Sequence, residues 1–350
     1  MRCAEQAWVC LVICLITFFA PECRAQAQHS TEHGPLKVTL SLDKTQLTVG
    51  EPLVFGVKLE NTRVARPIDI SASFQFPEGN GIRLIIQPEN ELEYRYSGAI
   101  EEGVYTALPV SVSRGTPRDV YQMVLFNRKT DGKLAFPKPG RYVVTASFEY
   151  HLSPAPEKHR AVLPPVTIEV SEATPADAAI LARSTEPEFL RSLHLGIATD
   201  TATLTLLRGM VDDPAFTVEG SNLAPLALRA CGYRMIASDF AAEEQLQGIA
   251  YLRRYLEATE KPFDGDGIVW SIAGAYHLMK RYDLAREWMF YGAVHYPNSP
   301  RIRPEDALYK YYIADPMMFA SSAPWYLLQS PWVVPGQAAP ENLKPVQESQ

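Results

Sequence analysis

The feature that most constrains the fold of this chain is a change in hydrophobic period near residue 172. Between residues 36 and about 171, apolar residues alternate with polar ones, most clearly from Leu36 to Leu42. This period of two is typical of β-strands with one buried face. From residue 172 to about 315, apolar residues recur at intervals of three and four, the period of an α-helix. We therefore expect a multidomain β + α protein: a β domain at 36–171, then an all-α domain at 172–315, and not an alternating α/β fold.

The β domain is expected to be an antiparallel β-sandwich. Its short alternating segments are separated by turn residues, as at 77–81 and 138–140. Gly, Pro and Asn at such positions favour reversals of the chain. Seven to nine short strands, with no helical period between them, favour two packed sheets joined by tight turns.

Two segments of this domain resemble the immunoglobulin-like superfamily. Residues 47–53 (LTVGEPL) are similar to the early hairpin of bacterial surface sandwiches, and residues 139–144 (PGRYVV) to the start of the penultimate strand. The resemblance implies that Tyr142 forms a tyrosine corner, in which its hydroxyl bonds to the backbone upstream. The cysteine pair and core tryptophan of antibody domains are absent. The resemblance therefore concerns architecture, which serves adhesion, inhibition, carbohydrate binding and spacing alike and selects no function.

The helical domain is predicted from caps and amphipathic stripes. Thr174 followed by Pro175 is typical of a helix start. In the segment 241–257, Leu246, Ile249 and Leu256 are expected to form the buried stripe. Further predicted caps, each before an apolar run, are Asp200, Asn222, Asp239, Asp266 and Asp283.

Residues 266–299 resemble a tetratricopeptide (TPR) repeat. The segment has 34 residues, the length of that repeat. Counted from Asp266, the residues that fall on consensus positions are Ile272, Ala273, Tyr276, Tyr282, Ala285, Gly292 and Pro297. Val269 stands where Trp is usual, with Trp270 one place on, and Met289 replaces the Phe. Because stacked repeats bury each other's faces, the resemblance implies a short TPR-like array of about three helix pairs.

TPR arrays bind partners on the concave face formed by the first helix of each pair. The resemblance places Trp270, Gly274 and His277 on this face, so Trp270 and His277 are the candidate partner-binding residues. Two alternatives stay open. Trp270 could anchor its helix against a neighbouring repeat or the sandwich, and His277 could be an ordinary surface histidine.

The first 27 residues are predicted to be a signal peptide, followed by a short linker at 28–35. Arg2 precedes an apolar run of about fourteen residues at 7–20, which is too short to span a bilayer. Small residues predict cleavage near Ala25 or Ala27. We therefore expect an exported protein, periplasmic or secreted, with no transmembrane segment after cleavage. Four of the five cysteines lie in the first 23 residues, which leaves Cys231 after cleavage. We expect Cys231 to be a buried, inert thiol, with a reactive or intermolecular thiol as the alternative.

The tail at 316–350 is rich in proline and aromatic residues. Its segments around Trp325 and Trp332 are too apolar for a free linker. We expect them to dock back and cap the last helix, with a partner-binding extended segment as the alternative.

The sequence carries no recognisable catalytic, cofactor or metal-binding motif. It lacks G-x-S-x-G, H-E-x-x-H, Walker, G-x-G-x-x-G and C-x-x-C patterns. His151 and His159 bracket a loop without the spacing of metal ligands, and residues 264–267 (DGDG) lack the further acids of a calcium loop. A net charge of -7 argues against a nucleic-acid partner.

These observations favour an exported, non-enzymatic interaction or scaffold protein of the bacterial cell envelope. It would bind a peptide or protein through its TPR-like helices, without a cofactor. One alternative is an envelope or extracellular hydrolase with a site at the junction between sandwich and helices. Another is a carbohydrate- or surface-binding sandwich that the helices only stabilise. The partner, the envelope layer and the oligomeric state do not follow from the sequence.

Overall fold

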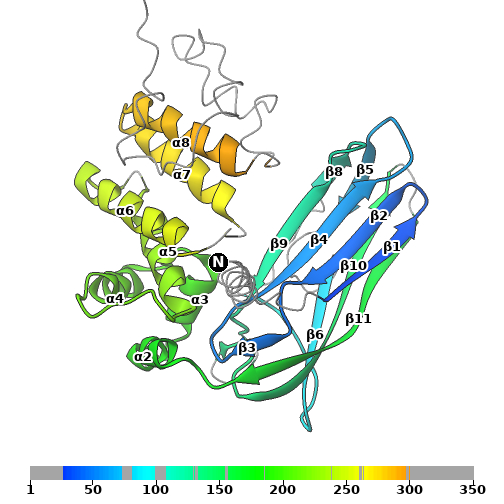
Figure 1. Cartoon of the computed structure of the whole chain (residues 1–350), viewed down its shortest axis with the longest axis horizontal. Helices are drawn as coiled ribbons and strands as arrows, with labels where there is room; N and C mark the ends of the chain where they lie inside the picture. The colour runs from blue at the N-terminus through cyan, green and yellow to red at the C-terminus, as the bar shows by residue number, and fades with distance from the viewer. Residues whose placement is uncertain are drawn as a thin grey trace, which may run out of the picture.

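The computed structural model describes residues 27–72, 81–98, 108–128, 130, 133–153, 157–184, 186–237, 239–259, 262, 264–296 and 299. The first part of the chain consists of β-strands and the second of α-helices, as the change of hydrophobic period predicts (Figure 1). Except for Ala27, the predicted signal peptide lies outside the described residues, as does the tail at 316–350.

The first sheet has four antiparallel strands in the order β1 (Ala27–His33), β2 (Leu36–Leu42), β4 (Leu53–Asn61) and β9 (Arg118–Val124). The predicted alternation is confirmed in β2, because its four alternate apolar side chains are fully buried. The residues predicted as a linker, 28–35, instead form most of β1 and its turn. Strand β1 pairs with β2 along its whole length, and its sequence AQHSTEH has no apolar stripe that could reveal it.

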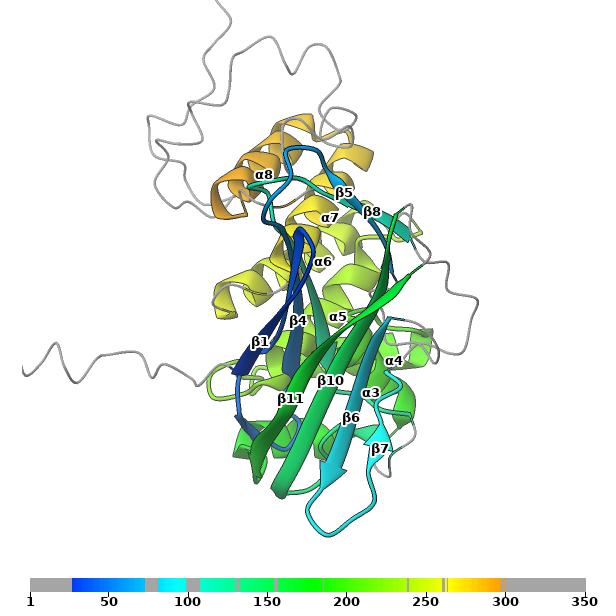
Figure 2. The same cartoon turned by 90° about the vertical axis from the view of Figure 1, so that its right-hand side faces the viewer.

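The second sheet is mixed. Its order is β3 (Gln46–Thr48), β11 (Lys158–Ser171), β10 (Gly140–Leu152), β5 (Ile68–Ala72) and β8 (Leu108–Val112), with β6 (Ile82–Pro88) paired to β10 and to β7 (Tyr94–Arg95). Strand β3 runs parallel to β11, so the pairing departs from the purely antiparallel expectation. The chain between β2 and β4 crosses to the other sheet there and lies beside the end of β11 (Figure 2). Apolar side chains of both sheets share one core.

The tyrosine-corner prediction for Tyr142 is confirmed by its hydrogen bonds. The Tyr142 hydroxyl donates to the carbonyl oxygen of Lys138 over 2.8 Å and accepts from the Lys138 amide over 3.3 Å. Its ring is 3% exposed and meets Phe136 edge-on. This contact fixes the loop that leads into β10.

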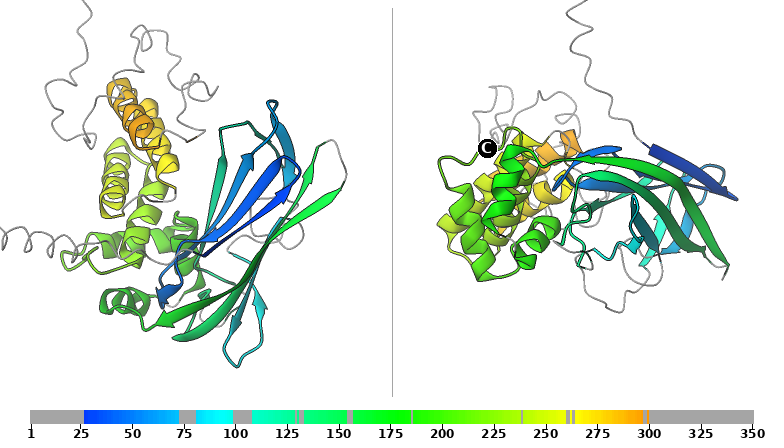
Figure 3. Two further views of the ribbon diagram at one scale, coloured as in Figure 1. Left: turned by 45° about the vertical axis from the view of Figure 1, so that its right-hand side comes forward. Right: turned by 90° about the horizontal axis from the view of Figure 1, so that it is seen from below.

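The second part of the chain folds into helices on one side of the sheets (Figure 3). They are α2 (Pro175–Arg183), α3 (Pro187–Leu195), α4 (Thr201–Val211), α5 (Leu223–Met235), α6 (Ala242–Ala258), α7 (Gly265–Leu278) and α8 (Tyr282–His295). Two of the predicted caps are confirmed, since Thr174 accepts the Asp177 amide and Asp200 accepts the Thr203 amide. Asp239, Asp266 and Asp283 lie near helix starts but are not the N-cap residues, which are Ala241, Asp264 and Arg281.

Helices α5 and α6 pack closely at a pair of glycines. A Cβ added at Gly232 would lie 2.8 Å from the Gly248 carbonyl oxygen, and one at Gly248 would lie 2.8 Å from the Met235 Cβ. Because Gly248 faces α5, the buried stripe of α6 runs through Gln245, Ile249, Leu252 and Leu256. The predicted stripe is therefore wrong at Leu246, which is 43% exposed.

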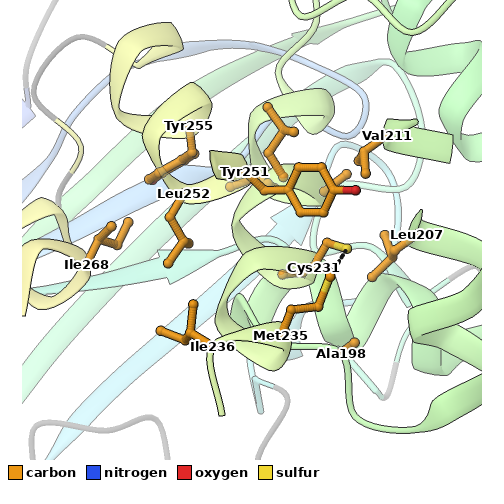
Figure 4. Packing of buried hydrophobic residues seen from close by; sticks show 14 of the residues in the cluster. Ala198, Leu207, Val211, Cys231, Met235, Ile236, Tyr251, Leu252, Tyr255 and Ile268 are labelled. Carbon is orange, nitrogen blue, oxygen red and sulfur yellow. Dashed lines mark hydrogen bonds between the residues drawn. The ribbon is translucent and has the colours of Figure 1, made fainter. Parts of the chain in front are cut away.

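Cys231 lies in the middle of the helical core, as predicted (Figure 4). Its side chain is fully buried and its Sγ lies 3.7 Å from the Met235 sulfur. Burial raises the pKa of the Cys231 thiol to about 12. Since the thiolate is the reactive form, this cysteine is inert.

Sheets and helices are joined by apolar contacts that belong to the helical core. Met123, Leu125, Phe126 and Leu134 come from the β region, yet they cluster with helical side chains. In the turn before β4, a Cβ added at Gly50 would touch the Leu223 side chain at 3.2 Å. The junction is therefore packed with apolar side chains.

A buried carboxylate adds a polar tie at the same junction. Asp177 of α2 is fully buried and accepts hydrogen bonds from the amides of Asn222 and Leu223 at the start of α5, each over 2.9 Å, and from the Ser221 hydroxyl over 2.6 Å. The Asn222 side chain also donates to Asp177, and it lies 3.3 Å from the Thr48 hydroxyl of β3. Asp177 thus caps α5 from a different helix, and Asn222 links that cap to the sheet.

Candidate functional site

The two candidate residues from the sequence lie on one stripe of α7. Trp270 and His277 are seven residues apart, about two helical turns. Gly274 lies between them on the same stripe and is buried. Trp270 is half-buried and packs against the helical core, and His277 is also half-buried. The stripe therefore consists of a tryptophan packed against the core, a buried glycine and a half-buried histidine.

The turn between α7 and α8 exposes apolar side chains beside this stripe. Leu278 is 64% exposed and Tyr282 is 37% exposed. The His277 ring meets the Tyr282 ring edge-on, with centroids 5.1 Å apart. We call His277, Leu278 and Tyr282 the hairpin patch. Of the three, only His277 was a candidate from the sequence, because exposure of an apolar residue at a helix end cannot be read from periodicity.

The backbone holds the hairpin patch in place. The Lys280 amide donates to the His277 carbonyl over 2.9 Å, and the Arg281 amide donates to the Tyr276 carbonyl over 2.8 Å. Lys280 is exposed at the rim of the patch and contributes a positive charge. This rigid apolar surface with a cationic rim can receive an apolar side chain of a partner that has an acidic neighbour.

A second group of polar residues, which the sequence reasoning missed, lies where four helices meet. Arg229 of α5 is 7% exposed, and its Nε lies 2.5 Å from the Asp264 Oδ2 at the start of α7. The Tyr255 hydroxyl of α6 donates to the other Asp264 oxygen over 3.0 Å. Gly196, just after α3, lies so close that an added Cβ would be 2.3 Å from the Arg229 Cζ. In the sequence, the feature that could have indicated this cluster is Arg229, a charged residue inside the apolar run of α5.

His194 of α3 lies beside the same cluster. The Tyr96 ring of the β region meets the His194 ring edge-on at a centroid distance of 6.5 Å, and the Arg229 charge acts on His194. Within the described residues no side chain hydrogen-bonds to the His194 Nδ1. Among the described residues, therefore, the His194 Nδ1 does not hold a hydroxyl or thiol in the arrangement that nucleophilic catalysis uses.

Protonation of His194 is expected to destabilise the fold in acid. Burial, and next the Arg229 charge, lower the pKa of His194 from 6.5 to about 3. The unfolded chain therefore takes up a proton below pH 6.5 while the folded chain does not, so stability is present above that pH and is lost as the pH falls. For a fully buried imidazole the loss is about 1.4 kcal/mol per pH unit. Because His194 as a whole residue is only partly buried, the loss at this position is smaller.

Urea unfolding near pH 7 and near pH 5 measures this effect. The variant His194→Gln should show a smaller pH dependence than the native protein. The matched control is His29→Gln, which alters an exposed histidine of β1 and should keep the native dependence. Equal pH dependence of native protein and His194→Gln would contradict the assignment.

Two histidines meet at the far end of the β core. His33 of β1 and His159 of β11 have ring centroids 4.9 Å apart, and the His33 Nδ1 contacts the Tyr150 hydroxyl. Burial, and then the charge of His159, lower the pKa of His33. The strand partner of His159 is Tyr150, whereas His151 is paired with Lys158, the next position of the β10–β11 ladder.

The described residues contain no group of three or more histidine, cysteine or acidic side chains placed to hold a metal ion. The acids of the calcium-like segment have other contacts. Asp264 forms an ion pair with Arg229 and accepts the Tyr255 hydroxyl, and Asp266 accepts the Gly267 amide and the Ser299 hydroxyl. In the described part of the chain no helix is both long and apolar enough to cross a bilayer.

Comparison with known proteins leaves the family open. No family model matches the sequence, and no curated protein is similar to it. A partly similar solved structure is Spo0M, a sporulation control protein from Bacillus subtilis, with 17% sequence identity and a TM-score of 0.19. The similarity covers 45% of this chain and 54%, about half, of that one. At this TM-score it carries no argument about fold or function.

Proposed function

We propose that this chain is an exported, non-enzymatic interaction protein of the bacterial cell envelope. In this proposal the two sheets form an immunoglobulin-like sandwich that serves as a mount. The helices from α5 to α8 form TPR-like pairs, and the hairpin patch on the last pair binds a peptide or protein. Export rests on the apolar run at 7–20 and the small residues after it.

The TPR-like reading is supported by consecutive helices of matching length. Helices α7 and α8 have 14 residues each, and a short turn joins them. The glycine contact between α5 and α6 serves the same purpose as the small residues of the repeat, which let paired helices approach. The preceding helix pair therefore supports the repeat reading through its packing, although its sequence lacks the motif.

The location that we propose for the binding surface is supported by what covers the first helix of each pair. In α5 the residues from Leu223 to Gly232 are all buried, and side chains of the β region belong to the same core. This helix has no free inner face. Helix α7 ends instead in an exposed leucine beside a half-exposed tyrosine, and this observation carries the proposal.

The junction also disfavours the alternative of a hydrolase. A catalytic site there needs an open cleft with convergent carboxylates or a nucleophile with its base. At the junction Asp177 instead accepts the first amides of α5, and in the neighbouring helical cluster Arg229 forms an ion pair with Asp264. A binding function needs no such constellation.

The proposal is tested by partner capture with variants of the full-length protein. Leu278→Asp places a charge in the hairpin patch and should weaken binding at least tenfold, about 1.4 kcal/mol. Leu246→Asp is the matched control, since Leu246 is an exposed leucine of the neighbouring helix pair. A protein recovered from envelope extract with the native chain is identified, purified and titrated against both variants.

The expected result is a large loss of affinity for Leu278→Asp and none for Leu246→Asp. A partner that binds both variants as tightly as the native chain would place the binding surface elsewhere. If the native chain captures no partner, the interaction function itself is wrong.

A further inference from the structure

The outer face of the four-stranded sheet carries a second surface, independent of the hairpin patch. In Figure 1 strands β1, β2, β4 and β9 fan out side by side, with no helix drawn in front of them. Helices border this face at one end, because Met123, two residues beyond Tyr121 on β9, belongs to the helical core. Their registers align outward residues in rows across the sheet. One row is Gln28, Ser41, Gly56 and Tyr121, and the next is Ser30, Thr39, Lys58 and Asp119.

Tyr121 is the aromatic residue of these two rows and lies over a glycine. A Cβ added at Gly56 would be 3.1 Å from the Tyr121 Cε1, 3.3 Å from its Cδ1 and 2.6 Å from the Ser41 Oγ. The ring therefore leans across β4 where a side chain is missing. Because Tyr121 is nonetheless 47% exposed, it presents ring surface to solvent.

Asp119 provides a hydrogen-bond acceptor next to this ring. It is two residues from Tyr121 on the same face of β9, about 7 Å along the strand. Lys58 and Glu60 act on Asp119 electrostatically, but among the described residues no group hydrogen-bonds to it. Partial burial raises the pKa of Asp119, which means that the charged carboxylate is incompletely solvated. A hydrogen bond from a ligand hydroxyl would stabilise this charged form.

The two lysines of this face already lie beside an acid. Lys58 lies 3.0 Å from Glu60, and Lys37 lies 3.3 Å from the same residue. Among the described residues of this face, both lysines are therefore engaged with an acid and are poorly placed to attract an anionic polymer. A neutral ligand with many hydroxyl groups finds an aromatic ring, a carboxylate, and the Ser30 and Thr39 hydroxyls, which bond each other over 2.8 Å.

We propose that this face binds a neutral polysaccharide, with one pyranose ring on Tyr121 and its hydroxyl groups at Asp119. The C–H face of a sugar ring is apolar and weakly positive, which suits the negative face of an aromatic ring. A hydroxyl that donates to a carboxylate makes a charge-assisted hydrogen bond. The open sheet has room for a chain of sugars, and this surface does not depend on the protein-binding function.

Affinity electrophoresis of the full-length chain tests the proposal, with laminarin, xylan, galactomannan and soluble starch each cast in the gel. The native chain should be retarded by at least one of them. Tyr121→Ala should weaken that binding at least tenfold, whereas Tyr121→Phe, which keeps the ring, should stay within about threefold. Asp119→Asn should weaken it severalfold. Val162→Ala changes an exposed residue of the other sheet and should bind as the native chain does.

Thermal unfolding of each variant separates a lost contact from a lost fold. If Tyr121→Ala is unfolded, Asp119→Asn decides, because among the described residues no hydrogen bond to Asp119 would be lost. The proposal is overturned if none of the four polysaccharides retards the native chain, or if a folded Tyr121→Ala or Asp119→Asn binds normally. It is also overturned if the face joins two copies of the chain, seen as a dimer that Tyr121→Ala dissociates. The Leu278→Asp titration reports on the protein-binding surface alone, so the two proposals can fail separately.

Discussion

Replacing Asp177 with alanine is expected to lower the free energy of unfolding by about 3–4 kcal/mol. The carboxylate is fully buried and accepts the first amides of α5, the Ser221 hydroxyl and the Asn222 side chain. Hydrogen bonds to a charged group are worth about 1.5–3 kcal/mol each, and donors left unpaired in the interior add to the loss. The variant also releases the Asn222 contact to the sheet. Urea unfolding followed by tryptophan fluorescence measures the change.

Two variants control for this effect. Asp177→Asn keeps one acceptor oxygen and should lose less than alanine does. Asp200→Ala removes a cap on α4 that accepts the Thr203 amide over 2.8 Å, but in an exposed position, so its effect should be far smaller. Equal losses for Asp177→Ala and Asp200→Ala would show that burial and the link between α2 and α5 contribute nothing.

The second large effect is expected at Arg229. The variant Arg229→Met leaves the Asp264 carboxylate without its cation in a nearly closed space, since the two side chains are only 9% and 16% exposed. Removing one partner of a buried ion pair typically costs about 3–5 kcal/mol. The same unfolding assay applies.

Arg234→Met is the matched control for Arg229→Met. Arg234 lies on the same helix and pairs with Asp239 over 2.7 Å, but these side chains are 31% and 59% exposed. Surface pairs of this kind are worth about 0–1 kcal/mol. In a double-mutant cycle, Arg229→Met with Asp264→Asn should lose less than the two single losses together. Additive losses would mean that the pair does not couple α5 to α7.

The β-strands of the fold were predictable where one face is apolar. Strand β2 has the predicted bounds and a fully buried apolar stripe, and Tyr142 makes its predicted corner bond. Strand β1 could not be predicted, because it is polar and exists through its pairing with β2. The parallel contact of β3 with β11 joins segments more than a hundred residues apart, which no local pattern encodes.

Helix ends were predictable when the cap lies next to its helix, as at Thr174 and Asp200. At α5 the sequence indicates Asn222, the polar residue before the apolar run. The carboxylate that caps this helix, however, belongs to Asp177, which is 45 residues before Asn222 in the chain. The error at Leu246 has a similar origin. The buried face of α6 is set by Gly248, which meets a neighbouring helix.

The candidate surface was predictable only in part. Helical period and the TPR resemblance place Trp270 and His277 on one stripe, and the helix bounds agree with that spacing. The exposure of Leu278 depends on where α7 ends and on what the rest of the fold covers. The position of Tyr121 over Gly56 depends on the register between β4 and β9. The exposure of Leu278 and the position of Tyr121 both depend on tertiary structure, so they cannot be predicted from the sequence of one segment.

The central claim, that the hairpin patch meets a protein partner in the envelope, is tested most directly by site-specific photocrosslinking in intact cells. A photoreactive phenylalanine analogue is placed at position 278 or, as the control, at position 246, both exposed leucines in the native chain. We expect one discrete crosslinked partner from position 278 and none from position 246. No adduct at 278, or the same adducts from both positions, would contradict it.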